Sequence, residues 1–230
     1  MPRRSEPVAK VEGLTVRFRY NVALDNLSLE IKRGRILLLG SNGSGKTTLM
    51  RVISGLLRPT TGRVEVLGLD PFRESGELYS RILYTRDVED LPYMLRVSTL
   101  VEMLSDVYGA KRVDKAVKIL RLGDHLFKRV GELSKGLRRR VSMIEPLASQ
   151  RELILMDEPF SGLDADSRVI IAKALSKLSK DTSLIIASHI PLNMGIDQMI
   201  VLEGGKLSYN GAYNSEVARR YLAWMEELTG

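Results

Sequence analysis

The chain has 230 residues, 44% of them hydrophobic and 27% charged, which is typical of a folded protein and excludes extensive disorder. It contains no cysteine and two histidines, which excludes disulfide frameworks, thiolate metal sites and histidine clusters. The formal net charge of +7 suits nucleic acid, an anionic membrane surface or an ordinary basic exterior, and charge alone does not choose among them.

The N-terminal part of the chain has the pattern of a series of strands, followed by one helix. Short runs rich in apolar and β-branched residues, bounded by turn residues, predict strands at 8–11, 14–18, 27–31, 36–39 and 63–67. Apolar residues recur at helical spacing over 49–57, directly after a glycine-rich segment.

The rest of the chain alternates between helical and strand patterns. Helical periodicity runs from 98 to about 122, inside a helical block that we place at about 88–150. Further strands are predicted at 153–156, 183–187 and 199–202, and further helices at 168–178 and 214–228. This alternation predicts an α/β protein with a mainly parallel sheet flanked by helices.

The most specific motif lies between the predicted strand 36–39 and the following helix. Its spacing fits G-x-x-x-x-G-K-[ST], in which backbone N–H groups wrap a triphosphate, Lys46 reaches the β- and γ-phosphates and the Thr47 hydroxyl ligates Mg²⁺. The nucleotide-binding residues predicted from this loop are Gly40, Ser41, Asn42, Gly43, Ser44, Gly45, Lys46, Thr47 and Thr48.

A second motif follows the apolar run 153–156, where Asp157 and Glu158 stand side by side. In a phosphate-loop ATPase, Asp157 at the tip of a buried strand would help to hold Mg²⁺, and Glu158 would polarise the attacking water. Two acids that simply cap a surface strand are the plainer alternative.

A third motif, Leu133-Ser134-Lys135-Gly136-Leu137, lies 24 positions before Asp157. With these three motifs in this order, the chain resembles the ATPase subunit of an ATP-binding cassette (ABC) transporter over essentially its whole length. The resemblance implies a P-loop NTPase core, an N-terminal antiparallel β subdomain and an inserted helical subdomain, all within a single ABC ATPase domain at 1–230. It also implies ATP as substrate and Mg²⁺ as cofactor.

The resemblance assigns roles to further residues. In this family a signature motif, here Ser134, Lys135 and Gly136, closes over the γ-phosphate of ATP held by a second subunit in a head-to-tail dimer. His189, which follows a predicted strand, matches the switch histidine that contacts the γ-phosphate, and with Glu158 and Lys46 it forms the expected catalytic group. The D-loop, which connects the two ATP sites, corresponds to Ser161, Gly162, Leu163 and Asp164.

Four positions remain open or depart from the family pattern. Phe18 or Tyr20 resembles the aromatic residue on which adenine stacks, and the spacing to Ala23 favours Phe18. Asp87 stands where the family usually has a glutamine that ligates Mg²⁺, and aspartate can also supply an oxygen ligand. Lys135 replaces the first signature glycine, where it either adds a cation near the phosphates or crowds them, and Leu137 replaces the polar residue or methionine that ends the family's signature.

The function implied is ATP hydrolysis that energises a transporter through a separate transmembrane permease, with export favoured slightly over import. No apolar run approaches the ~18 residues of a membrane span, so we expect a peripheral location at the cytoplasmic face of the cell membrane. The chain would form a homodimer or a heterodimer with another ABC ATPase. The arginine run 138–140 lacks flanking aromatic residues, so nucleic acid is not expected as a partner.

Two alternatives remain. One is a soluble ABC-family ATPase without a membrane partner, and the other is an ATP-binding partner subunit with weak hydrolysis.

Overall fold

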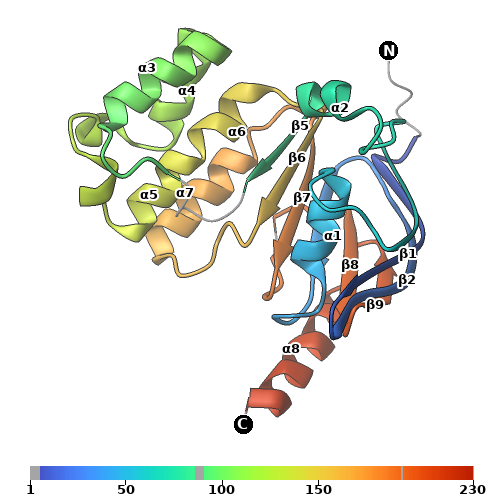
Figure 1. The fold of residues 1–230 in the computed structure, drawn as a ribbon. Coiled ribbons are helices and arrows are strands. Elements are labelled where there is room, and N and C mark those ends of the chain that lie inside the picture. Colours follow the sequence, from blue (N-terminus) through green and yellow to red (C-terminus); the bar gives the residue numbers. More distant parts are fainter. Residues whose placement is uncertain (1–5, 86–90, 193, 230) are drawn as a thin grey trace. The chain divides into compact units, whose positions relative to one another are not determined.

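The computed structural model describes residues 6–85, 91–192 and 194–229, and the chain divides into two compact units (Figure 1). The first unit comprises residues 1–84, 152–158 and 183–230, and the second comprises 85–151 and 159–182. The second unit therefore includes 159–182 in addition to the helical block expected at 88–150.

A three-stranded antiparallel sheet occupies one side of the first unit. Its order is β2 (Asn21–Ile31), β1 (Ala9–Phe18) and β4 (Thr61–Val66). The segments 8–11 and 14–18, predicted as two strands, form the single strand β1. Gly13 has a φ of 55° and the register with β2 shifts between Val11 and Leu14, so a bulge replaces the expected break.

A six-stranded sheet carries the sequence motifs. Its order is β5 (Ile82–Thr85), β6 (Leu153–Asp157), β7 (Ser183–Ser188), β3 (Arg35–Leu39), β8 (Gln198–Glu203) and β9 (Lys206–Gly211). The pairs β6–β7, β7–β3 and β3–β8 are parallel, and β8–β9 is antiparallel. The predicted α/β class with a mainly parallel sheet is confirmed. Since β6, β7 and β3 are parallel neighbours, the segments after their carboxyl ends meet at one sheet edge.

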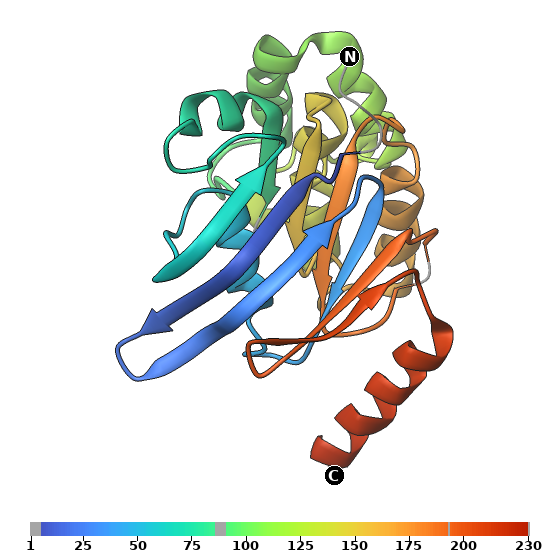
Figure 2. The same ribbon diagram turned by 90° about the vertical axis from the view of Figure 1, so that its right-hand side faces the viewer.

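Helices cover both faces of this sheet within the first unit. Ile36 and Leu38 of β3 join a core with the three-stranded sheet and with α1 (Lys46–Ile53), while α2 (Ser75–Arg81) adds Leu78 to the same core. Leu37 and Leu39 point to the opposite face and pack with α8 (Ser215–Thr229), drawn in red in Figure 2. Alternate residues of one buried strand thus anchor both layers.

The second unit is helical. It contains α3 (Val97–Tyr108), α4 (Ala110–Ile119), α5 (Lys135–Ser142), α6 (Ile144–Ser149) and α7 (Ala165–Leu175). The helical segment predicted from 98 to about 122 is divided into α3 and α4, because Gly109 has a φ of 90°, outside the helical range. Among the described residues, no helix combines the length and apolar character that crossing a bilayer requires.

Candidate functional site

The glycine-rich loop connects β3 to the N-terminus of α1. Gly45 has a φ of 102°, and a Cβ added there would lie 2.6 Å from the backbone oxygen of Ala23, so no larger residue fits without strain. Directly after this glycine, α1 begins at Lys46. The loop and the helix N-terminus therefore present backbone N–H groups in the arrangement that binds phosphate.

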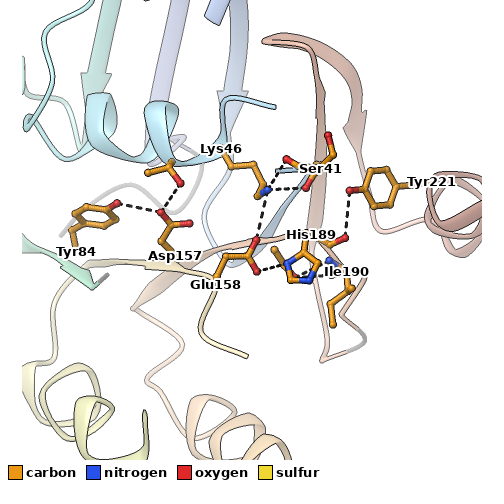
Figure 3. Close-up of polar contacts among 11 residues, drawn as sticks. Ser41, Lys46, Tyr84, Asp157, Glu158, His189, Ile190 and Tyr221 are labelled. Carbon is orange, nitrogen blue, oxygen red and sulfur yellow. Dashed lines mark hydrogen bonds and ion pairs between the residues drawn. The ribbon is translucent and has the colours of Figure 1, made fainter. Parts of the chain in front are cut away.

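The side chain of Lys46 folds back over the loop and is 5% exposed. Its Nζ donates hydrogen bonds to the backbone oxygens of Gly40 at 2.7 Å and Ser41 at 3.0 Å (Figure 3). The same Nζ lies 3.6 Å from Oε1 of Glu158. Burial lowers the pKa of the Lys46 ammonium below its usual value, and the carboxylates of Glu158 and Asp157 partly oppose that shift.

Glu158 lies between this ammonium and the imidazole of His189. The His189 Nδ1 is 2.8 Å from Oε2 of Glu158, and because a carboxylate only accepts hydrogen bonds, Nδ1 is the donor (Figure 3). The backbone of Glu158 has a left-handed φ of 49°, and its N–H donates to the Ala187 oxygen at 3.0 Å. A non-glycine residue in this region is strained, which is a frequent property of functional sites.

The hydroxyl of Thr47 donates to Oδ2 of Asp157 at 2.7 Å. The other oxygen, Oδ1, is buried and has no hydrogen-bond partner among the described residues. A carboxylate with an unsatisfied oxygen beside a threonine hydroxyl fits a hard cation such as Mg²⁺. The described residues contain no group of three or more His, Asp or Glu side chains placed around a metal, so most ligands would have to come from phosphates and water. Asp87 lies outside the described residues.

Two tyrosines that the sequence analysis did not select also touch this site. The Tyr84 hydroxyl lies 3.4 Å from Oδ2 of Asp157, and the Tyr221 hydroxyl donates to the backbone oxygen of His189 at 3.3 Å (Figure 3). Burial raises the pKa of Tyr221 to about 12, so it remains a donor at neutral pH. No sequence pattern marks Tyr221, which lies in the C-terminal helix, far along the chain from every motif.

A cavity of about 270 Å³ borders the glycine-rich loop. Phe18, Asn21 and Ala23 line it together with residues of the loop and Glu158. Phe18 is 47% exposed, whereas Tyr20 is 98% exposed and is not part of the lining. The geometry thus favours Phe18 over Tyr20 beside a bound base, although stacking itself stays a prediction. A larger hollow of about 770 Å³ lies over β1 and β4, and none of its described lining residues belongs to the motifs.

The signature and D-loop residues pack together in the second unit. Ser134 precedes α5, and its Oγ accepts a hydrogen bond from the N–H of Leu137 at 3.3 Å. Asp164 precedes α7 in the same way, with Oδ1 accepting from the N–H of Ser167 at 2.7 Å. A Cβ added at Gly136 would lie 2.5 Å from Oδ2 of Asp164 and from Oγ of Ser167, so only glycine fits at this contact.

Lys135, which departs from the family pattern, is exposed and extends over the D-loop. Its Nζ would lie 2.5 Å from a Cβ added at Gly162, whose φ of 63° is left-handed. The neighbouring Asp164 caps α7. Hydrogen bonds from Ser167 hold the pKa of the Asp164 carboxyl below its usual value, so this carboxylate is ionised near neutrality. The end of the Lys135 side chain lies over Gly162.

Comparison with known proteins places these features in a family. The family model described as ABC transporter matches residues 24–161. The ATP-binding protein NatA of an ABC transporter from Bacillus subtilis is 32% identical, with 84% of this chain and 83% of the relative covered. The bacitracin transport ATP-binding protein BcrA of Bacillus licheniformis is 28% identical, with 87% of this chain and 68% of the relative covered.

A solved structure with the same fold is cbiO1 from Clostridium perfringens, part of the transporter complex cbiONQ. It has a TM-score of 0.78 and 25% identity, and the match covers 97% of this chain and 95% of that one.

Proposed function

The chain belongs to the ABC transporter family, in which it is an ATP-binding and ATP-hydrolysing subunit, and we propose that its hydrolysis drives transport through a separate transmembrane permease. The hydrolytic part of this proposal is carried by the position of the Glu158 carboxylate, between Lys46 and His189 and beside the phosphate loop. The transport part is supported by the similarity to ATP-binding proteins of transporters. A carboxylate held in this way supports in-line attack of water on a bound triphosphate.

In the proposed reaction Glu158 accepts a hydrogen bond from a water molecule whose oxygen attacks the γ-phosphorus. A bond forms between this oxygen and phosphorus as the bond to the bridging oxygen breaks, and ADP leaves with the electron pair of that bond. The proton lost by the water passes to Glu158 and from there to the phosphate or to solvent. Lys46 stabilises the charge that develops on the phosphoryl oxygens, and His189 contributes a second donor after rotating away from Glu158. The hydrogen bond from Tyr221 holds the backbone of His189 in place.

Mg²⁺ would be held by Thr47 and Asp157, with Asp87 as a further predicted ligand. When bound, this ion neutralises phosphate charge. The Thr47 hydroxyl and the unsatisfied Oδ1 of Asp157 are the two oxygens of the described chain that support its placement here.

The signature is proposed to act on ATP held by another subunit. Ser134, Lys135 and Gly136 stand at the N-terminus of α5, where a hydroxyl and free backbone N–H groups suit a phosphate. In a homodimer both sites would contain Lys135, whereas in a heterodimer it would affect only the site built on the partner's phosphate loop.

We place the subunit at the cytoplasmic face of the membrane, bound through its permease, with export favoured over import. The loose similarity of the segments 68–71 and 161–164 to the drug- and polymer-exporter type of this family supports this direction. A soluble ATPase without a membrane partner, or a partner subunit with weak hydrolysis, would be the alternative.

Capture from membranes tests the proposal. Membranes of the source cells are solubilised in mild detergent, the tagged chain is captured, and co-purifying proteins are quantified, with an untagged chain as control. We expect one polytopic membrane protein in stoichiometric amount, whose reconstitution with the chain changes the ATPase rate. Recovery with soluble proteins or ribosomes alone would overturn the permease assignment.

A further inference from the structure

Helices α4 and α7 of the second unit border two adjoining hollows whose rims are cationic. The first, about 400 Å³, is lined by the basic residues Lys111, Arg112, Lys115 and Lys177. The second, about 360 Å³, is lined by Lys118, Arg121 and Lys173, and it shares Lys177 and Ile119 with the first. We call these seven cationic residues the basic face.

The basic face concentrates the charge of the chain. It holds seven of the 35 Lys and Arg residues, and among the described residues Asp166 is the only acidic one in the lining, so the lining carries +6 of the formal +7. Asp114 and Asp181 lie on the same segments but outside both hollows, as does Lys180. All seven cations are exposed, and within the described part of the chain none of them forms an ion pair.

Part of this accumulation opposes the stability of α4. Lys111 and Lys115 are of like charge and lie four residues apart on that helix, so they repel each other, while Asp114 is the single acidic residue of α4 that offsets its cations. A bound polyanion would relieve this repulsion. The arrangement therefore points to an anionic partner outside the chain.

The lining indicates which polyanion fits. Within the part of the chain that the structure describes, no aromatic residue borders either hollow, although stacking on aromatic rings is what holds the bases of single-stranded nucleic acids. Apolar groups lie among the cations instead: Val169 is 51% exposed, and Ile119 and Leu178 are half-buried. Long cationic side chains around a shallow apolar surface suit the headgroup region of a bilayer.

We propose that the basic face binds anionic phospholipid headgroups at the membrane surface. The contact adds a direct lipid interaction to the proposed location of the subunit, and it depends on neither the permease nor ATP hydrolysis. Each cation near an anionic bilayer strengthens binding about fivefold, and the effect decays within a Debye length.

Flotation with vesicles tests this inference. The purified chain, without nucleotide, is mixed with phosphatidylcholine vesicles that contain or lack phosphatidylglycerol. The test variant carries Lys111→Gln, Lys115→Gln and Lys177→Gln. The control variant carries Lys10→Gln, Lys32→Gln and Lys128→Gln, which remove the same charge from exposed positions outside the basic face. Circular dichroism and thermal melting establish that both variants fold.

We expect the chain to bind vesicles with phosphatidylglycerol far more tightly than those without it, and to be released as salt rises from about 0.1 M to about 1 M. The test variant should lose affinity on the order of 100-fold, and the control variant much less. No preference for phosphatidylglycerol, or equal loss in both variants, would overturn the inference. Tighter binding to a labelled single-stranded RNA than to the vesicles would also overturn it.

The ATPase rate, measured in parallel, should be the same in both variants and the parent chain. Vesicle binding without a co-purifying permease would support the lipid contact while contradicting the proposed partner. The two proposals can therefore fail separately.

Discussion

At the residue scale, the side chain of Glu158 contacts two groups, Lys46 and His189, that we propose act on phosphate. Oε1 faces the ammonium of Lys46 and Oε2 accepts from His189, while the backbone of Glu158 has a φ of 49°. Such a conformation costs about 1–3 kcal/mol for a residue other than glycine. The cost is consistent with selection for the position of the carboxylate, since a relaxed backbone would direct it elsewhere.

We expect Glu158→Gln to abolish most of the hydrolysis and to retain ATP binding. Glutamine keeps the size of the side chain but is a poor hydrogen-bond acceptor for water, and general-base catalysis contributes about 10²–10⁴-fold to a rate. Phosphate release and equilibrium nucleotide binding measure the two effects. Glu30→Gln, an exposed change on β2, serves as the control. Unchanged turnover in the Glu158 variant would remove this residue from the catalytic role.

At the scale of elements, two helix starts meet in the second unit. Ser134 caps α5, Asp164 caps α7, and the absence of a side chain at Gly136 allows the first turns of these helices to touch. The capping residues thus stabilise the helices and also belong to the predicted signature and D-loop. A side chain at residue 136 would separate the two motifs.

Replacing Lys135 tests what its charge does at the start of α5. Lys135→Gly restores the first glycine of the family signature and should raise the ATPase rate of a homodimer severalfold, because it clears the N-terminal N–H groups of α5 for phosphate. Glycine lowers helix stability by up to about 1 kcal/mol, so Lys135→Ala is the matched control that removes the ammonium and preserves the helix. If neither change alters ATPase rate or ATP affinity, Lys135 has no effect on the site.

At the scale of the whole molecule, the two units carry different parts of the predicted machinery. The first unit holds the phosphate loop, both carboxylates and His189, and the second holds the signature and the D-loop. The resemblance to the family implies that the signature of one subunit completes the ATP site of another. The working unit that we propose is therefore a dimer.

ATP-dependent association tests the dimer. Glu158→Gln at saturating ATP should convert the chain from monomer to dimer, because bound γ-phosphate persists when hydrolysis is blocked. Light scattering during size-exclusion chromatography measures the mass. The double variant Lys46→Ala and Glu158→Gln should stay monomeric, since it lacks the ammonium that binds the phosphates. A monomer in the Glu158→Gln sample would rule out the homodimer.

Sequence patterns predicted the strands of the parallel sheet well, because β3, β6, β7 and β8 are almost continuous apolar runs buried on both faces. The short elements α2, β5 and β9 were not predicted, since they contain few residues and only a weak periodic signal. Periodicity also did not reveal the division at Gly109, because apolar spacing continues across it while the backbone does not.

The sequence by itself determined the nucleotide chemistry of this protein. In the phosphate loop the glycines, Lys46 and Thr47 are neighbours along the chain, so their spacing already specifies how they surround a phosphate. Only the tertiary structure decided which distant groups meet. Thr47 and Asp157 are 110 residues apart, and Tyr221 reaches His189 from the C-terminal helix. Such contacts depend on strand order and helix packing, and these are set by the burial of the whole core.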